Sequence, residues 1–293
     1  MAKITAETIK KMKFNHEKIS ALTAYDYSTA QVLDEAGVDV LLVGDSAAMV
    51  MLGYKTTHEI SMNEMTIFTR AVARGVKNAL IVGDMPFGSY QASISEAVTN
   101  ACDLIKAGAN AVKLEGGSDY IIEIVERLTT QGVPVMAHLG FTPQYLNALG
   151  GYKIQAKEFE QTEFILNQAK KLQKAGAFSI VLEMVSEEAA KYITENLSIP
   201  VIGIGAGRFC DGQILVIDDI LGKYNDFTPK FAKKYADLNS VIGSAVSEYV
   251  EDVKRSKFPT EEHIFVMKQE EREKLENASY IKGWRTKYTY KKI

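Results

Sequence analysis

The 293-residue sequence predicts an α/β protein built on a closed (β/α)8 barrel, or TIM barrel, with an N-terminal helix at residues 5–13 and a C-terminal helical extension. Three observations support this prediction. Apolar segments recur as continuous runs, which is typical of parallel strands covered on both faces. Several runs follow a helix that ends in a tight turn, as at residues 35–37, 106–108 and 174–176. Finally, eight such runs can be counted, with amphipathic segments between most of them.

The expected elements follow in order along the chain. The strands are expected at residues 19–23, 39–44, 79–84, 110–115, 133–138, 178–183, 199–204 and 213–217. The clearest helices between them are expected at residues 61–74, 93–107, 119–131, 159–175 and 186–196. Thr5 is a suitable N-cap for the first helix. Ser61 with Glu64, and Ser93 with Glu96, fit the capping box, in which two residues three apart satisfy each other's backbone amides.

The predicted domain organisation is one catalytic domain followed by an extension. Residues 1–263 are expected to form the barrel domain, which a helix at 231–256 closes. The segment after residue 205 is too short for a full helix before the last strand. Residues 264–293 form a charged, partly helical extension, with a helix expected at 266–277 and a basic, aromatic end.

Composition excludes several classes of function. The net charge of −3 and the pI near 5.9 give no electrostatic basis for binding nucleic acid. Cys102 and Cys210 lack metal or redox spacing and are expected to be inert thiols in a reducing cytosol. The N-terminus lacks the apolar segment of a secretory signal, and no apolar run approaches the roughly 20 residues of a membrane span. We therefore expect a cytoplasmic protein with neither nucleic-acid nor membrane partners.

Polar residues gather where the predicted strands end. In a barrel, catalytic groups lie at this edge, where the strands lead into the following loops. Reading the strand ends in order gives Tyr25, Asp26, Asp45, Ser46, Asp84, Lys113, Glu115, His138 and Glu183, and then the glycines at 203, 205 and 207. Four of the later residues are carboxylates, which makes this edge the candidate active site.

Asp45 and Asp84 each follow a glycine at the end of an apolar strand. A strand-end aspartate is often a turn or N-cap residue, but two in the same context favour ligands of a divalent cation. Glu115 would lie nearby. Few protein ligands leave room for water and substrate, as Mg²⁺ prefers.

Lys113 and Glu115 are two residues apart, so a strand would place both side chains on one face, inside the barrel. Lys113 is then either a structural partner of the acids or a binder of an anionic substrate. His138 by itself is more often a core residue than a ligand. Glu183 has no neighbouring cation in the sequence and suits a general base. The glycines of segment 203–207 fit either a phosphate loop or close backbone packing.

Together these residues predict metal-assisted enolate chemistry. A 2-oxo acid could bind a divalent cation through its carboxylate and keto oxygens, and the metal would act as a Lewis acid. Lys113 would offset the negative charge, and Glu183 would remove the proton next to the carbonyl. The residues by themselves leave the electrophile open.

Over roughly residues 4–264 the sequence resembles one enzyme family. The motifs are T-A-Y-D-Y at 23–27, V-G-D-S at 43–46, G-D-M-P-F at 83–87, V-K-L-E-G-G at 112–117, H-L-G-F-T-P-Q at 138–144, G-G-Y-K at 150–153, V-L-E at 181–183, I-P-V-I-G-I-G-A-G at 199–207, D-G-Q at 211–213, P-K-F at 229–231 and E-E-H at 261–263. So many motifs in order resemble the ketopantoate hydroxymethyltransferases (3-methyl-2-oxobutanoate hydroxymethyltransferases) of pantothenate biosynthesis.

The resemblance implies an activity, a metal and an assembly. It implies transfer of a hydroxymethyl group from 5,10-methylenetetrahydrofolate to 3-methyl-2-oxobutanoate, giving 2-dehydropantoate, through Mg²⁺-stabilised enolate chemistry. Other divalent cations could replace Mg²⁺. It also implies a (β/α)8 barrel assembled as a homo-oligomer, usually a homodecamer, whose other partners are the 2-oxo acid and the folate.

The resemblance also assigns roles to the strand-end residues. The implied metal ligands are Asp45, Asp84 and Glu115. The implied contacts with the oxo acid are Asp45, Ser46, Asp84, Lys113 and the pocket residue His138. The implied proton acceptor is Glu183. The chain departs from the family pattern at Ala47-Ala48, where Leu-Gly is usual, and at Arg208-Phe209-Cys210, where small polar residues are more typical.

Two other functions stay open at this point. One is another metal-dependent enzyme of 2-oxo acid enolates, of the phosphoenolpyruvate mutase or isocitrate lyase type. Such enzymes often carry a cysteine after a lysine-glycine turn, and this sequence has none. The other is a non-catalytic binding protein that kept the barrel. The presence of Asp45, Asp84, Lys113 and Glu183 argues against it.

Overall fold

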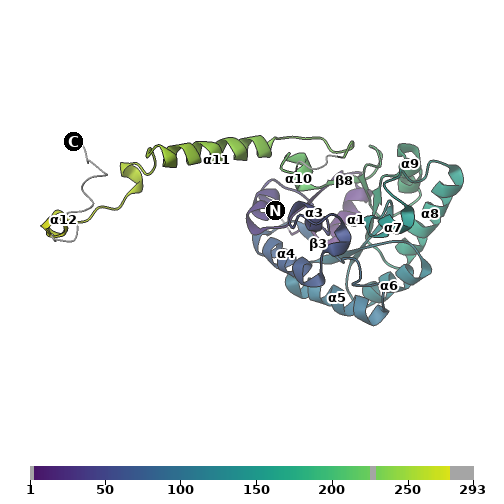
Figure 1. Ribbon diagram of the computed structural model, residues 1–293. Coiled ribbons are helices and arrows are strands. Elements are labelled where there is room, and N and C mark those ends of the chain that lie inside the picture. Colours follow the sequence, from purple (N-terminus) through teal and green to yellow (C-terminus); the bar gives the residue numbers. More distant parts are fainter. Residues whose placement is uncertain (1–2, 225–228, 278–293) are drawn as a thin grey trace. The chain divides into compact units, whose positions relative to one another are not determined.

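The computed structural model describes residues 3–224 and 229–277 (Figure 1). The chain divides into two compact units, residues 1–238 and 239–293. The boundary that the sequence led us to expect, at residue 263, therefore lies inside the second unit. The physical reason is that no residue of the helix that closes the expected domain is buried. None of the described helices is long and apolar enough to cross a membrane.

The first unit holds the predicted barrel. Eight parallel strands pair in sequence order, and the last pairs with the first. They are β1 (Ile19–Thr23), β2 (Val40–Val43), β3 (Leu80–Asp84), β4 (Ala111–Glu115), β5 (Val135–Gly140), β6 (Ser179–Glu183), β7 (Val201–Ile204) and β8 (Gly212–Leu215). Every strand lies within two residues of its expected position. The fold prediction is confirmed.

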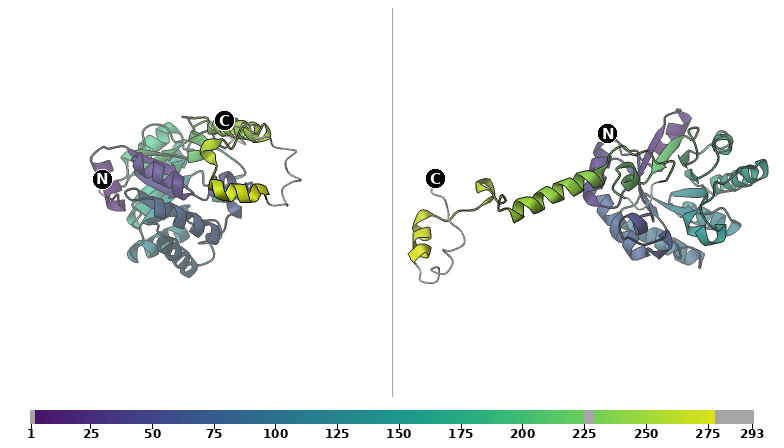
Figure 2. Two further views of the ribbon diagram at one scale, coloured as in Figure 1. Left: turned by 90° about the vertical axis from the view of Figure 1, so that its left-hand side faces the viewer. Right: turned by 45° about the horizontal axis from the view of Figure 1, so that its top comes forward.

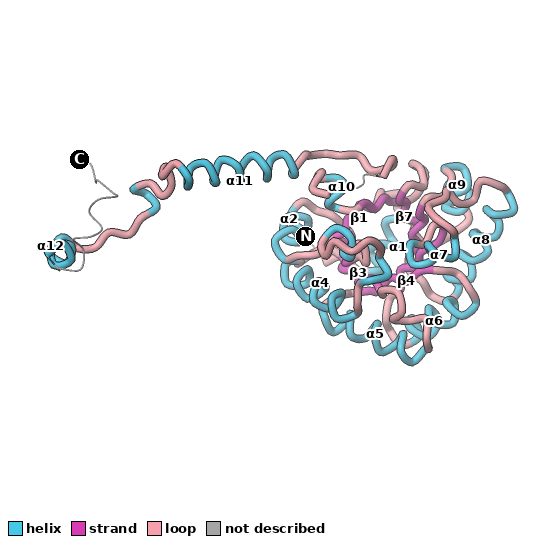
Figure 3. The backbone as a smooth tube through the Cα atoms, in the orientation of Figure 1, coloured by secondary structure: helices cyan, strands magenta, loops and turns pink. Residues whose placement is uncertain are grey.

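Helices surround the ring of strands (Figure 3). The longer ones in the first unit are α1 (Ala6–Phe14), α2 (Tyr27–Glu35), α4 (Met62–Gly75), α5 (Ile94–Ala107), α6 (Asp119–Thr130), α8 (Phe159–Lys174) and α9 (Glu187–Glu195). Figure 2 shows the same helical layer from two further directions. Among the described residues no helix separates β7 from β8, as the short segment after residue 205 led us to expect.

Short helices extend the loops at the carboxyl ends of three strands. They are α3 (Ala47–Val50) and η1 (Thr57–Glu59) after β2, η2 (Pro143–Tyr145) and α7 (Leu146–Leu149) after β5, and α10 (Ile217–Ile220) after β8. These short helices could not be predicted from the sequence, because runs of three or four residues carry no clear periodicity. They deepen the barrel mouth on the side where the candidate active site lies.

The helix starts agree with the capping signals, with one exception. Thr5 caps α1, and Ser61 and Glu64 form the reciprocal capping box of α4. At α5 the Ser93 side chain accepts from the backbone amide of Glu96, but the Ser93 backbone amide does not donate to the Glu96 carboxylate in return. The capping box predicted there is therefore only half formed.

The interior of the barrel is apolar towards the amino ends of the strands. Side chains at alternate strand positions, together with Phe178 just before β6, pack there as one cluster: Ile19, Ala21, Val40, Leu42, Leu80, Val82, Ala111, Met136, Phe178, Val181, Ile202 and Ile214. Helix α1 adds Ile9 to this cluster, and Lys13 of the same helix donates to Asp211 at 2.8 Å. Helix α1 thus packs against the amino end of the barrel, whereas the candidate site lies at the carboxyl end.

The second unit contains α11 (Leu238–Lys254, which begins at the last residue of the first unit), η3 (Glu261–His263) and α12 (Gln269–Asn277). The helices expected at residues 231–256 and 266–277 are both present but start later than predicted. The rings of Tyr249, Phe258 and His263 contact one another, with centroids 5.9 and 5.1 Å apart. The basic, aromatic end at 278–293 lies outside the described residues.

Candidate active site

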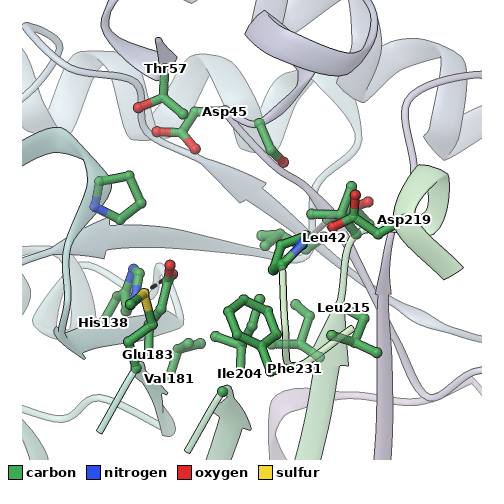
Figure 4. A pocket seen from close by; sticks show the side chains of 18 of the residues that line it. Leu42, Asp45, Thr57, His138, Val181, Glu183, Ile204, Leu215, Asp219 and Phe231 are labelled. Atoms are coloured by element: carbon green, nitrogen blue, oxygen red, sulfur yellow. Dashed lines mark ion pairs between the residues drawn. The ribbon is translucent and has the colours of Figure 1, made fainter. Parts of the chain in front are cut away.

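A cavity of about 600 Å³ opens at the carboxyl ends of the strands (Figure 4). All seven residues to which the sequence analysis gave a role line it: Asp45, Ser46, Asp84, Lys113, Glu115, His138 and Glu183. They come from four adjacent strands and from the loop after β2. The barrel therefore brings together residues that lie up to 138 positions apart in the chain.

Strand parity explains why these side chains point inwards. Successive side chains of a strand alternate between its two faces, so every second residue of a barrel strand faces the interior. In β3, Asp84 lies on the same inward face as Leu80 and Val82. In β4, Lys113 and Glu115 lie on the same inward face as Ala111. The lower layers of the barrel are apolar, and the top layer carries the charges.

Lys113 lies between two carboxylates. Its Nζ is 2.8 and 2.9 Å from the two oxygens of Asp84 and 3.4 Å from Oε1 of Glu115. Burial lowers the pKa of Lys113, but the charges of Asp84, Glu115 and Asp45 outweigh burial and raise this pKa above its usual value. The structure thus shows Lys113 as a partner of the acids, and because Lys113 also lines the cavity, its second possible role as a binder of an anionic substrate stays open.

His138 joins Glu115 to Glu183. Its Nδ1 is 3.1 Å from Oε1 of Glu115. Burial lowers the pKa of His138, but the Glu115 charge outweighs burial and raises this pKa to about 9. Burial also raises the pKa of Glu115, but Lys113 and His138 together lower it to about 2. At neutral pH the pair is therefore an imidazolium next to a carboxylate.

Glu183 is not solitary in the fold, although it has no cationic neighbour in the sequence. Its Oε2 is 3.4 Å from Nε2 of His138, which brings a positive charge to the carboxylate (Figure 4). The contact is a long ion pair, and Nε2 of His138 makes no hydrogen bond within the described structure. Glu183 thus faces the cavity beside the positive charge of His138.

Asp45 is held by a residue that the sequence analysis did not select. The Gln144 side chain donates to Oδ2 of Asp45 at 2.9 Å, and the Gln144 backbone amide donates to Oε2 of Glu115 at 3.0 Å. The Tyr90 hydroxyl donates to Oε1 of Gln144 at 2.6 Å. Gln144 is the last residue of the H-L-G-F-T-P-Q motif, so the motif could have indicated a role for it. It was not selected because its amide side chain is uncharged.

The two aspartates of the proposed metal set are neighbours. The backbone amide of Asp45 donates to Oδ2 of Asp84 at 3.2 Å. Burial raises the pKa of Asp45 well above its usual value, and the negative charge of Asp84 raises it further. A cation between the two carboxylates would relieve this repulsion, and carboxylate oxygens are the ligands that Mg²⁺ prefers. The donor set therefore fits a divalent cation.

Glu115 fits the metal set less directly. Its Oε1 faces Lys113 and His138, and its Oε2 accepts from the Gln144 amide. Both oxygens of Asp84 also contact Lys113, and within residues 3–224 and 229–277 no group of three or more His, Cys, Asp or Glu side chains is placed to hold a metal ion. The ligand set Asp45, Asp84 and Glu115 stays a prediction.

Ser46 and the two unusual alanines form the start of the loop after β2. The hydroxyls of Tyr25 and Ser46 are 2.8 Å apart, so Tyr25 positions Ser46 at the cavity wall. Ala47 and Ala48 are buried in α3, which has ordinary right-handed helical geometry. Because alanine favours this conformation, the loop has no need of the glycine that is usual in the family.

The glycines of segment 203–207 serve close packing, one of the two roles that the sequence left open. Gly205 has φ +62°, and a Cβ at this position would lie 2.7 Å from the Phe231 ring. Phe231 and Gly205 both line the cavity. The absent side chain thus lets Phe231 form part of the cavity wall.

A closed parallel barrel with titratable side chains at its carboxyl mouth defines a (β/α)8-barrel enzyme. The ketopantoate hydroxymethyltransferase family matches residues 3–261 of the chain. The chain therefore belongs to this family, and the resemblance that the motifs indicated is confirmed.

Relatives in this family cover most of the chain. A 3-methyl-2-oxobutanoate hydroxymethyltransferase of Syntrophus aciditrophicus is 53% identical over 265 residues, which are 90% of this chain and 97% of the relative. Enzymes of the same name from Thermotoga maritima and Clostridium novyi are 52% and 50% identical, over 90% and 93% of this chain and 97% and 99% of the relatives.

Solved structures of lower identity share the fold. A phosphonopyruvate hydrolase in complex with oxalate and Mg²⁺ has a TM-score of 0.57 at 13% identity, with 95% of this chain and all of that chain covered. A 2,3-dimethylmalate lyase of the PEP mutase/isocitrate lyase superfamily has a TM-score of 0.55 at 16% identity, with 92% and 97% covered. These likenesses concern the fold, so the family match takes precedence over the phosphoenolpyruvate mutase alternative.

Proposed function

We propose that the chain transfers a hydroxymethyl group from 5,10-methylenetetrahydrofolate to 3-methyl-2-oxobutanoate, giving 2-dehydropantoate for pantothenate biosynthesis. The observation that carries the proposal is the convergence of Asp45, Asp84, Lys113 and Glu183 on one cavity at the barrel mouth. Membership of the ketopantoate hydroxymethyltransferase family supports the choice of substrates. A non-catalytic binding protein would not require this buried cluster of charged side chains, whose burial costs free energy.

The reaction balances with water as the third reactant. The C3–H bond of the oxo acid breaks, and its proton passes to a base while C3 keeps the electron pair. C3 then forms a bond to the methylene carbon of the folate. Both C–N bonds of that carbon break, the two folate nitrogens take up protons, and water supplies the hydroxyl group. Tetrahydrofolate and 2-dehydropantoate are the products.

Each of the following cavity residues has a proposed role in this reaction. Glu183 accepts the C3 proton, because its carboxylate faces the cavity and keeps its oxygens available. His138 holds Glu183 and contributes a positive charge beside the reacting carbon. Lys113 offsets negative charge on the oxo acid, and Ser46 donates a hydrogen bond to it.

Mg²⁺ is the proposed metal. Asp45 and Asp84 would hold it, with Glu115 beside it and engaged by Lys113, His138 and the Gln144 amide. When bound, Mg²⁺ would supply a Lewis acid for the keto and carboxylate oxygens of the substrate. The fold relative described with oxalate and Mg²⁺ supports this, because oxalate also presents two adjacent oxygens.

A turnover assay tests the whole proposal at once. With 3-methyl-2-oxobutanoate, Mg²⁺ and 5,10-methylenetetrahydrofolate, we expect 2-dehydropantoate to form, as followed by mass spectrometry. Omission of the folate or chelation of the metal should stop product formation. Without the folate, the enzyme should still exchange the C3 proton of the oxo acid with deuterium from the solvent. The proposal would be contradicted by full turnover in the absence of the folate donor.

We also propose that the chain assembles as a homo-oligomer, specifically a homodecamer, as the family resemblance implies. Helix α11 exposes apolar side chains at helical spacing, namely Val241, Ile242, Val246, Tyr249, Val250 and Val253. An exposed apolar face of this kind is typical of protein–protein interfaces. A second copy of this chain is the proposed occupant.

Light scattering after gel filtration tests this assembly. We expect the mass of ten chains for the natural sequence and a smaller assembly for Val246→Asp, because a charge in an apolar interface is costly. Glu248→Lys, a charge change on the same helix, serves as the control and should keep the natural mass. A monomer of the natural sequence would be contrary to the proposal.

A further inference from the structure

The cavity has a second region that the proposed chemistry of the oxo acid does not use. The charged residues described above occupy one side. The other side is lined mainly by apolar residues of β2, β7 and β8 and the segment around residue 230, namely Leu42, Ile204, Ile214, Leu215 and Phe231. Figure 4 shows Leu42 and Leu215 on the side of Asp219, with His138 and Glu183 on the opposite side. A cavity of about 600 Å³ is within the range that holds a ligand larger than a small oxo acid.

Asp219 is the acid of this apolar region. It lies in α10, lines the cavity and is 6% exposed. Its carboxylate has no hydrogen-bond or ion-pair partner among the residues that the structure describes. The adjacent Asp218 differs, because it pairs with Lys223 at 3.3 Å and does not line the cavity. A carboxylate that lines a cavity without a protein partner can accept hydrogen bonds from a ligand that enters the cavity.

The charge of Asp219 restricts which chemical groups that ligand can present to it. Burial and the charge of Asp218 raise the pKa of Asp219 to about 6, against the opposing charge of Lys234. At neutral pH the side chain is therefore mainly a carboxylate, which only accepts hydrogen bonds. The oxo acid is an anion without N–H groups, so Asp219 would repel it. The ligand must carry N–H donors and a surface that packs against apolar and aromatic side chains.

One of the two proposed substrates has this chemistry. The pterin ring of a folate is flat, and its ring N3–H and 2-amino group lie side by side on one edge. These two donors match the two oxygens of a carboxylate, which accepts paired hydrogen bonds in one plane. The ring faces would contact Phe231 and the neighbouring aliphatic side chains. Resting on the proposed function, we propose that Asp219 binds the N3–H and 2-amino edge of the pterin ring of the folate substrate.

This placement assigns the two substrates to the two sides of one cavity. The oxo acid occupies the side of Glu183, Lys113 and the aspartates, and the pterin occupies the side of Asp219 and Phe231. Asp219 is then a binding residue of the folate that has no role in removing the C3 proton. Loss of Asp219 should affect binding of the folate while the half-reaction of the oxo acid continues.

The test uses the isosteric variant Asp219→Asn in the full chain. We expect it to weaken binding of tetrahydrofolate about 10- to 100-fold, the range for loss of a hydrogen bond to a charged group, as measured by calorimetry. Deuterium exchange at C3 of 3-methyl-2-oxobutanoate, without folate, should stay within about threefold of the natural enzyme. Asp218→Asn is the matched control, with both measurements close to those of the natural chain.

A folate analogue with a 2-methyl group in place of the 2-amino group gives a second test, whose first measurement uses the natural enzyme alone. The natural enzyme should bind the analogue about 10-fold or more weakly than tetrahydrofolate, and Asp219→Asn should discriminate much less. Equal binding of both ligands by the natural enzyme would overturn the inference. So would loss of deuterium exchange in Asp219→Asn, which would place this residue with the oxo acid.

The two proposals fail in different ways. If the natural enzyme neither exchanges the C3 proton nor binds tetrahydrofolate, the proposed function fails and the inference fails with it. If the natural enzyme does both, and Asp219→Asn binds tetrahydrofolate equally well, the inference alone fails.

Discussion

Replacing Glu183 with glutamine should abolish deuterium exchange at C3 of 3-methyl-2-oxobutanoate and lower kcat by about 10²- to 10⁴-fold, the usual contribution of a general base. Glutamine has nearly the same shape as glutamate but cannot accept the proton. The Glu183 side chain lines the cavity, and its Oε2 lies 3.4 Å from Nε2 of His138. The other carboxylates on this side of the cavity are engaged, because Asp84 and Glu115 contact Lys113 and Asp45 accepts from Gln144.

Binding measurements separate this role from a structural one. Calorimetry should give affinities of Glu183→Gln for Mg²⁺ and the oxo acid within a few-fold of the natural values. Glu188→Gln, a change of the same kind at an exposed residue of α9, should leave exchange and turnover unchanged. Normal exchange in Glu183→Gln would remove Glu183 from the role of base.

Replacing Asp84 with alanine should weaken Mg²⁺ binding by more than about 100-fold, since the loss of groups that only orient a metal ligand already costs 10- to 100-fold. Asp84 is 1% exposed, accepts from the backbone amide of Asp45 and pairs with Lys113. Its removal takes away the proposed ligand oxygen and the negative charge that neutralises Lys113. Turnover should be lost together with metal binding.

Two further measurements keep this prediction testable. Asp84→Ala leaves Glu115 as the remaining ion-pair partner of Lys113, and this loss could destabilise the fold. The thermal unfolding temperatures of Asp84→Ala and of the isosteric Asp84→Asn are therefore compared with that of the natural chain. Asp39→Asn is the matched control, because Asp39 precedes β2 at the amino end of the barrel, away from the cavity. A folded Asp84 variant with unchanged calorimetric affinity for Mg²⁺ would show that Asp84 is not a ligand.

The fold could be predicted almost completely from the sequence. A parallel strand covered on both faces must be apolar along its whole length, and eight such runs leave a clear pattern. The short elements α3, η1, η2, α7 and α10 could not be predicted in this way, because three or four residues show no period. The end of the first unit at residue 238 also escaped prediction, since α11 has the composition of a packed helix but is exposed.

The candidate site could be predicted in part. Asp84, Lys113, Glu115 and Glu183 stand at strand ends, so strand parity and barrel closure are enough to bring them together. Gln144 was missed, because its hydrogen bonds join Asp45 and Glu115 across 99 and 29 positions of the chain. The ion pair of His138 with Glu183 was missed for the same reason.

The sequence by itself determined which residues stand at the barrel mouth, because strand period and strand order are local properties of the chain. Only the tertiary structure decided how those residues are paired, because pairing depends on distances of a few ångströms between side chains from different strands. Asp219 illustrates the difference. In the sequence it is one of two adjacent aspartates. In the fold, Asp218 pairs with Lys223, whereas Asp219 lines the apolar side of the cavity.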